Sequence, residues 1–205
     1  MHELVGPFEG AEAVIPTEAW GDLRVESRVF TAAVDGDLVV TAGDAFAEPE
    51  PLVRIHSECV FGDVFFSTFC DCREQLDMAM AAILSAGTGI LFYLRIDGRG
   101  AGLAAKVAAT ALETAGVDTF DSRVHVGVSP ESREYRAIGE YLRTRGVKRI
   151  RLMTNNPEKV AQIAQSGIEV ARVPLFEAAP NEAVLRLYRT KAKRFGHDIP
   201  TPDES

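Results

Sequence analysis

The hydrophobic and polar positions of this chain change their spacing about a third of the way along its 205 residues. Residues 23–30, 37–44 and 52–58 carry apolar residues in short runs or in alternation, which is typical of strands. Asp35 and Gly36 separate the first two and form a typical turn pair. The N-terminal third therefore predicts an antiparallel arrangement of strands.

From Glu74 onward the apolar residues recur at helical spacing. Leu76, Met80 and Ile83 fall on one face, and the pattern ends at Gly87, which predicts a helix. The same reasoning predicts strands at 89–96, 148–154 and 168–175, and helices at 103–116, at 131–146, from 157 and at 181–196. Strands that alternate with helices predict an α/β fold, a layered mixed sheet flanked by helices, with a largely antiparallel N-terminal part.

We expect one domain over residues 1–205. The first 20 residues are interrupted by Pro and Gly and show no periodicity, so we expect them to be irregular. Residues 1–15 and 197–205 are expected to be loose at the two ends of this domain. The chain shows no internal repeat, low-complexity tract or long linker that would divide it.

The composition narrows the class of protein. Hydrophobic residues make up 46% of the chain and charged residues 25%, proportions typical of a folded globular protein. The formal net charge of -8 argues against broad binding to nucleic acid or to an anionic membrane. No stretch reaches the roughly 18 apolar residues of a membrane span. The N-terminus does not resemble a signal peptide, so we expect a cytoplasmic protein.

All three cysteines of the chain, Cys59, Cys70 and Cys72, lie in the stretch SECVFGDVFFSTFCDC. In a reducing compartment, clustered cysteines are more often metal ligands or catalysts than disulfides. Three thiolates leave one position of a tetrahedral zinc open, and a water bound there acquires a pKa near neutrality. The spacing C-x10-C-x-C therefore favours a catalytic zinc site. Three half-buried cysteines without a metal are the alternative.

A glycine loop at 97–106 follows one predicted strand and precedes a helix. Its glycines do not match the dinucleotide pattern G-x-G-x-x-G, because Leu103 stands at the last position. Arg99 and the backbone amides at a helix start suit an anion such as phosphate. A tight strand-to-helix turn explains the loop equally well.

Two further cations lie where a helix is predicted to begin. Lys159 falls in the first turn of the helix after residue 157, where a cation is unfavourable to the helix dipole, which indicates an anionic ligand. Asn155 and Asn156 before it are explained by helix capping. Arg133 lies in the first turn of the helix predicted from 131, and a solvated helix face is the simpler interpretation there.

In this order, these stretches resemble the GTP cyclohydrolase II family. The resemblance rests on VRIHSE, C-x10-CDC, GRGAGL, LMTNNPEKV, RVPL and TKAKRFGH, and it extends from residue 16 onward. It implies a homodimer that depends on zinc, one ion per chain, and on magnesium bound with the nucleotide phosphates. Such an enzyme hydrolyses the imidazole ring of GTP, releases formate from C8, and releases diphosphate, which opens riboflavin synthesis.

The resemblance also assigns site residues. Cys59, Cys70 and Cys72 match the metal ligands. Arg133 matches an arginine proposed to attack the α-phosphate, and Glu131 stands in the place of an aspartate assigned as proton acceptor. The positions that match nucleotide-binding residues are Arg54, Ile55, His56, Ser57, Glu58, Gln75, Asp97, Gly98, Arg99, Thr119, Thr154 and Lys159.

The chain departs from the family pattern around the reacting base. Phe69 and Ile96 replace polar residues of the motifs, Glu131 is one methylene longer than the aspartate, and Thr110 stands in place of an active-site tyrosine. We therefore expect a GTP cyclohydrolase II-like hydrolase that opens the ring and releases diphosphate but releases formate incompletely.

Two other functions stay open. One is the complete riboflavin-pathway reaction, which gives the diamino-ribosylamino-pyrimidinone phosphate, formate and diphosphate. The other is a protein that binds guanine nucleotides without catalysis. A dinucleotide-binding oxidoreductase is disfavoured by Leu103.

Overall fold

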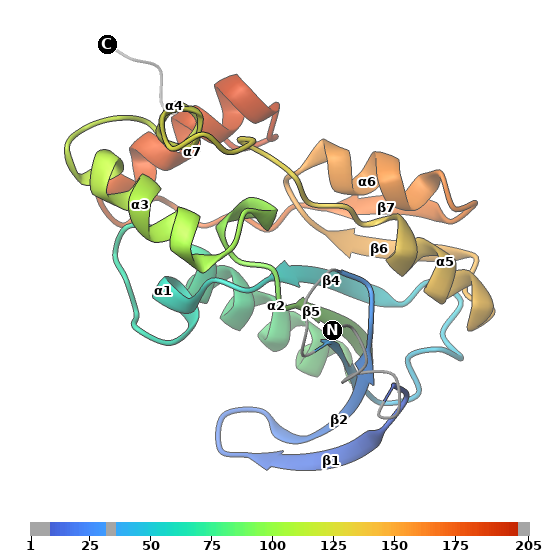
Figure 1. The fold of residues 1–205 in the computed structure, drawn as a ribbon. Coiled ribbons are helices and arrows are strands. Elements are labelled where there is room, and N and C mark those ends of the chain that lie inside the picture. The colour runs from blue at the N-terminus through green and yellow to red at the C-terminus, as the bar shows by residue number, and fades with distance from the viewer. Residues whose placement is uncertain (1–8, 32–35, 201–205) are drawn as a thin grey trace.

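The computed structural model describes residues 9–31 and 36–200. A mixed seven-stranded sheet in the order β1-β2-β3-β5-β4-β6-β7 forms its centre (Figure 1). The strands are β1 Glu12–Thr17, β2 Gly21–Arg28, β3 Asp37–Ala42, β4 Leu52–Ser57, β5 Gly89–Leu94, β6 Arg149–Met153 and β7 Glu169–Val173. The helices are α1 Val60–Asp63, α2 Cys72–Ala86, α3 Leu103–Thr114, α4 Asp121–His125, α5 Arg136–Thr144, α6 Pro157–Ala164 and α7 Glu182–Phe195, with a short 3-10 turn, η2, at Gly98–Gly100. The predicted α/β fold is confirmed.

The sheet divides into an antiparallel and a parallel part. β1, β2, β3 and β5 pair antiparallel, which confirms the prediction for the N-terminal part. Asp35, of the predicted turn, lies outside the described residues. β5, β4, β6 and β7 pair parallel, because helices connect them and return the chain to the same end of the sheet.

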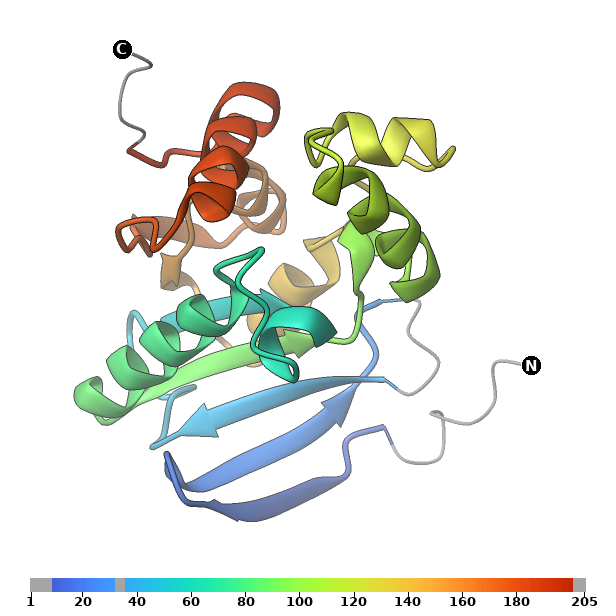
Figure 2. The same ribbon diagram turned by 90° about the vertical axis from the view of Figure 1, so that its left-hand side faces the viewer.

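Helices cover both faces of the central strands (Figures 1 and 2). On one face, α5 and α6 pack on alternate residues of β4 and β5, among them Ile55 and Phe92, which are fully buried. On the other face, α2 lays Leu76, Met80 and Ile83 against the remaining alternate residues. β4 and β5 are buried on both faces, which explains why β5 is almost continuously apolar; β4 also carries Arg54 and His56, which are buried and hydrogen-bonded.

Three parallel strands end at the same edge of the sheet. β4 runs into Glu58 and Cys59, β5 into the glycine loop that begins at Asp97, and β6 into Thr154. Ligands of open α/β sheets bind outside the carboxyl ends of the strands. Helices α3 and α7 rise beyond this edge (Figure 2), so the fold places the predicted motifs between them. No helix in the described residues is long and apolar enough to cross a membrane.

The expectation of an irregular and loose N-terminus is wrong for the part that the structure describes. β1 pairs with β2 along its whole length, and Gly10 N donates to Ser27 O at 2.8 Å. Nearly all of β1 is exposed, so no buried face produces an alternating apolar pattern. Backbone pairing rather than side-chain burial forms this strand. Residues 1–8 lie outside the described residues.

The expectation of a loose tail from 197 is likewise wrong as far as residue 200. Asp198 N donates to Asn155 O at 2.9 Å, and Ile199 is buried against Val184 and Tyr188 of α7. Residues 201–205 are not described. The short helices α1 and α4 had no sequence signal, since each is shorter than two turns.

The helix predicted at 131–146 begins only at Arg136. Tyr135 N, which would close the first helical turn, donates instead to Gln162 Oε1 at 2.6 Å. Arg133 N donates to the Glu131 side chain at 3.0 Å. Because side chains take these backbone donors, residues 131–135 stay non-helical, and Arg133 is not part of a helix face.

Candidate active site

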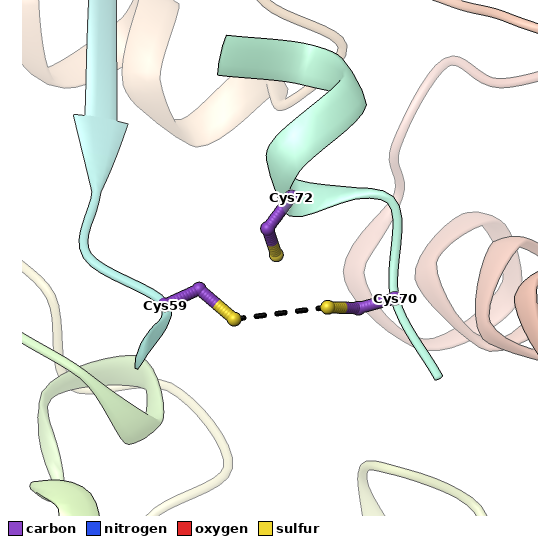
Figure 3. A group of neighbouring side chains, drawn as sticks. All are labelled: Cys59, Cys70 and Cys72. Carbon is purple, nitrogen blue, oxygen red and sulfur yellow. Dashed lines mark hydrogen bonds between the residues drawn. The ribbon is translucent and has the colours of Figure 1, made fainter. Parts of the chain in front are cut away.

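Three thiols converge at the edge of the sheet (Figure 3). Cys59 follows β4 and caps α1, Cys70 lies in the loop before α2, and Cys72 is the first residue of α2. Their Sγ atoms all lie within 4.8 Å of one another, and those of Cys59 and Cys70 are 3.7 Å apart. Two sulfurs on one tetrahedral zinc, at about 2.3 Å each, lie about 3.8 Å apart. The three cysteines therefore fit a zinc ion.

The thiols are electrostatically prepared to ligate a cation. Lys106 Nζ donates to Cys59 Sγ at 3.0 Å and to Asp97 Oδ1 at 2.6 Å. Hydrogen bonds from Cys70 and Cys72, together with Lys106, lower the pKa of Cys59 despite its burial. The hydrogen bond to Cys59 raises the pKa of Cys70 to about 12. Ligation of a metal by all three cysteines would release the protons that the thiols carry.

Asp63 fixes the backbone at Cys59. Its carboxylate accepts hydrogen bonds from Cys59 N at 3.0 Å, from the Tyr93 hydroxyl at 2.9 Å and from His56 Nε2 at 3.2 Å. Burial lowers the pKa of His56, so it is a neutral ring that stacks on Tyr93. In the described residues the group of candidate metal ligands consists of the three cysteines without His56.

A cavity opens beside the thiols, and cations dominate its charged lining. Its basic residues are Arg54, Arg99, Lys106, Arg123, Arg133, Lys159 and Lys191, and its acidic residues are Glu58, Asp71, Asp97 and Glu113. The whole chain has the opposite balance, with a formal net charge of -8. The local excess of positive charge suits a polyanion.

Two of these cations are largely buried and, in the part of the chain that the structure describes, lack a carboxylate within hydrogen-bond distance. Lys159 Nζ donates to the Ile55 carbonyl at 2.8 Å and forms no ion pair within the described residues. Burial, followed by the charges of Arg54 and Arg133, lowers the pKa of Lys159. Burial and the charges of Arg133 and Arg123 lower the pKa of Arg99 to about 9. Glu131, which lies 3.9 Å away, opposes this shift only in part. An anionic ligand would relieve this repulsion, which makes both residues functional candidates.

Arg133 is held at the cavity by its neighbours. Its Nε donates to Glu131 at 2.7 Å, and its Nη1 lies 3.4 Å from Ser57 Oγ. The segment that carries Ser132 and Arg133 approaches η2 closely: a Cβ on Gly100 would lie 3.1 Å from Ser132. Gly100 also has a positive φ of +91, so a glycine is favoured there on both counts. Although burial opposes it, the hydrogen bond and charge of Arg133 lower the pKa of Glu131. Glu131 is therefore a carboxylate that orients Arg133.

The structure brings nearly all the predicted site residues to this cavity. Those that line it are Arg54, His56, Ser57, Glu58, Cys59, Cys70, Cys72, Gln75, Asp97, Gly98, Arg99, Thr110, Thr119, Arg133, Thr154 and Lys159. Ile55 does not line it, because its side chain is in the core and only its carbonyl reaches Lys159. Glu131 contacts the cavity through Arg133. Asn156 caps α6, as capping predicted, and accepts a hydrogen bond from Glu158 N at 2.9 Å.

Several cavity residues were missed by the sequence reasoning. Lys106 lies in the first turn of α3, so the helix-dipole argument made for Lys159 applied to it as well. Asp71 lies between two candidate ligands but is also ordinary as a residue before a helix. Lys191 and His197 come from the far end of the chain, and no local pattern connects them to the cysteines.

The fold and the site define an α/β protein with a candidate thiolate metal centre beside an anion-binding cavity. The profile of the GTP cyclohydrolase II family matches residues 9–174. The chain belongs to this family, whose members are hydrolases that act on GTP.

Curated relatives cover most of the chain. GTP cyclohydrolase-2 of Yersinia pseudotuberculosis is 38% identical over 190 residues, which are 91% of this chain and 95% of that protein. GTP cyclohydrolase-2 of Neisseria meningitidis is 40% identical over 191 residues, 91% of this chain and 94% of that protein. A riboflavin biosynthesis protein of Vibrio vulnificus is 40% identical over 186 residues, 90% of this chain. The match covers 50% of the Vibrio protein, so the chain spans half its length.

Proposed function

We propose that this protein hydrolyses the imidazole ring of GTP at C8, at a zinc ion held by Cys59, Cys70 and Cys72. The observation that carries the proposal is the convergence of three Sγ atoms within 4.8 Å at the rim of a cation-lined cavity. When bound, zinc supplies a water acidic enough to act as a nucleophile near neutral pH. Family membership and the names of the relatives supply the substrate.

In this proposal, one group of residues binds the phosphates of the nucleotide and another group surrounds its base. Arg99, Lys159 and Arg133 take the phosphates, because these largely buried cations lie near one another and Glu131 is the carboxylate that pairs with two of them. The base lies toward the thiols, between Lys106 and the side of the cavity formed by Arg54 and Gln75. Magnesium accompanies the phosphates in this proposal, and the product enters riboflavin synthesis, as the name of the Vibrio relative suggests.

Arg133 acts as a clamp on the α-phosphate rather than as a nucleophile. A guanidinium attacks phosphorus only after it loses a proton. Although burial opposes it, the hydrogen bond and charge of the Glu131 carboxylate raise the pKa of Arg133, which favours its cationic form. The planar guanidinium of Arg133 can donate hydrogen bonds to two oxygens of one phosphate. By neutralising the negative charge on these oxygens, it assists departure of the diphosphate.

A second candidate function is ring opening in which the formyl group is retained. Thr110 lies one turn after Lys106 on α3, and both line the cavity. The hydroxyl of threonine stays next to the backbone, whereas that of tyrosine would reach several ångströms farther. Cleavage of the formamide needs a proton delivered to the departing nitrogen, and loss of a positioned donor costs about a hundredfold to ten-thousandfold. The first hydrolysis would survive this loss while the second stalls.

A nucleotide-binding protein without catalysis is the weaker alternative. Such a protein needs the cations of the cavity but not three converging thiols, one of which accepts a hydrogen bond from Lys106.

We also propose that the protein is cytoplasmic. Its three free cysteines fit a reducing compartment, and cell fractionation would test this location.

Replacing Cys70 with Ser should abolish zinc binding and ring opening together, because a neutral hydroxyl is a poor zinc ligand. Elemental analysis should find one zinc per chain in the unaltered protein, and mass spectrometry of a GTP reaction should find a ring-opened pyrimidine. Thr68→Ser, in the same loop and exposed, is the control and should retain both properties. Ring opening at full rate by metal-free protein would contradict the proposal.

Arg133→Ala should reduce diphosphate release by about a hundredfold or more while zinc content stays unchanged. Arg133→Lys should rescue poorly, since an ammonium cannot reproduce the fork. Arg136→Ala is the control, because Arg136 is exposed and pairs with Glu140 on α5 at 3.2 Å. Diphosphate measured by a coupled assay decides the matter, and an unaffected alanine variant would remove Arg133 from the mechanism.

Thr110→Tyr should move the product from the formylated pyrimidine toward free formate, quantified by a formate dehydrogenase assay. Thr114→Tyr places the same ring one turn later at an exposed position and should leave the product ratio unchanged. Stoichiometric formate from the unaltered protein, at the rate of its diphosphate release, would refute retention of the formyl group. It would favour the complete reaction instead.

Magnesium dependence and a homodimer are expected from the family resemblance. Zinc-loaded protein in chelator-treated buffer should regain diphosphate release when Mg²⁺ is added, and light scattering should give twice the chain mass of 22.3 kDa. Activity without added Mg²⁺, or a monomer at all concentrations, would contradict the respective expectation.

A further inference from the structure

Helix α7 (Figure 1) lies beyond residue 174, where the family match ends. Its residues Leu187 and Lys191 nevertheless line the cavity. Lys191, near the end of this helix, donates from Nζ to Asp71 Oδ1 at 2.9 Å. The Lys191 side chain is 13% exposed and that of Asp71 only 5%. This is a largely buried ion pair between segments 120 positions apart in sequence.

Asp71 is the residue between Cys70 and Cys72. Its second oxygen, Oδ2, accepts a hydrogen bond from Gln75 Nε2. Gln75 Oε1 in turn accepts from Arg54 Nη2 at 2.7 Å. A continuous chain of polar contacts thus runs from α7, through the loop that carries two candidate ligands, to the central strand β4.

Other contacts fix α7 near both of its ends. Asn181 Nδ2 donates to Thr68 O at 3.1 Å, two residues before Cys70. Phe195 lies under the Arg99 guanidinium, with 4.1 Å between Cζ and the ring centroid. The helix is therefore held against the cysteine loop and against the glycine loop, and Lys191 lies between these two anchor points.

We propose that Lys191 is a positioning residue of the metal site, which acts through Asp71 on Cys70 and Cys72. Without Lys191, a nearly buried carboxylate would keep only neutral hydrogen-bond partners, the Gln75 amide and the Tyr188 hydroxyl. A buried charge that has lost its counter-ion is strongly unfavourable. Asp71 would relieve this by turning toward water. That rotation would move the backbone between Cys70 and Cys72, which directs both thiols.

This inference deepens the proposed function and depends on it for the identity of the metal. Loss of an outer contact that orients metal ligands typically weakens metal affinity by about 10- to 100-fold. We expect a loss of this size in zinc affinity, which is measurable without any turnover of GTP.

Lys191→Met removes the charge and keeps a long side chain on α7. Competition with a chromophoric chelator should show zinc bound about 10- to 100-fold more weakly than by the unaltered protein. In the cobalt-loaded variant, the thiolate-to-cobalt absorption bands should change, which reports the arrangement of the sulfurs. Lys193→Met on the same helix is the control, since Lys193 is exposed, and it should change neither quantity. Lys191→Arg should recover most of the affinity.

The double variant Lys191→Met with Asp71→Asn tests whether the two residues act as a pair. It removes both charges, so no uncompensated carboxylate is left, and its zinc affinity should exceed that of Lys191→Met alone. If Lys191→Met does not fold, as judged by circular dichroism, the Arg variant and the double variant carry the same comparison.

Wild-type zinc affinity and an unchanged cobalt spectrum in Lys191→Met would overturn the inference and leave the proposed function intact. A double variant whose zinc affinity does not exceed that of Lys191→Met would overturn it too. Protein that binds zinc but does not open GTP would refute the proposed function while the affinity test of Lys191 still stands. Protein that binds no zinc at all would refute both.

Discussion

The parallel pairing of β4 with β5 on one side and β6 on the other is the constraint on which the site depends. It brings three segments that are far apart in sequence to one edge of the sheet. Cys59 follows β4, Asp97 and Arg99 follow β5, and Thr154 follows β6. Because the strands are buried on both faces by α2 and by α5 and α6, their register cannot slip without exposing the core. The geometry of the site is therefore fixed by the buried centre of the sheet.

Around this edge the protein keeps charges in an arrangement that favours ligands. Lys159 and Arg99 are buried close to other cations, and the pKa of each is lowered as a result. The thiols of Cys70 and Cys72 share their protons with the Cys59 thiolate. A polyphosphate would relieve the repulsion between the cations, and a divalent cation would replace the protons shared by the three sulfurs. The cavity thus has charges that suit both a metal and a nucleotide, which agrees with membership of a family that acts on GTP.

Site residues could be predicted from the sequence where a residue type is unusual for its position. The clustering of three cysteines is one such case, and a lysine in the first turn of a helix is another. The structure brings Lys159 and the cysteines to one cavity. The central strands were predicted well because burial leaves apolar runs. β1 was missed because it is exposed, and the start of α5 was misplaced because Gln162, a distant residue, takes the Tyr135 N–H. Tertiary contacts of this kind leave no periodic pattern.

The contribution of α7 was also beyond local reasoning. The motif TKAKRFGH, which ends at His197, resembles the family pattern but does not indicate which residues it contacts. The ion pair between Lys191 and Asp71 becomes visible only in the folded structure. His197 illustrates the same point: burial and the cations Lys191 and Arg99 lower its pKa to about 3, so it is a neutral ring in the wall of the cavity. Long-range charge neighbours set these properties, and they become known only when the fold is known.

Zinc K-edge X-ray absorption on the purified protein tests the central claim most directly, because it reports the ligands of the metal irrespective of substrate or product. The account predicts three sulfur scatterers at about 2.3 Å and one lighter oxygen scatterer at about 2.0 Å. The zinc should be lost in Cys70→Ser. A metal coordinated mainly by nitrogen and oxygen, or protein that retains no zinc, would contradict the assignment of Cys59, Cys70 and Cys72 as the metal site.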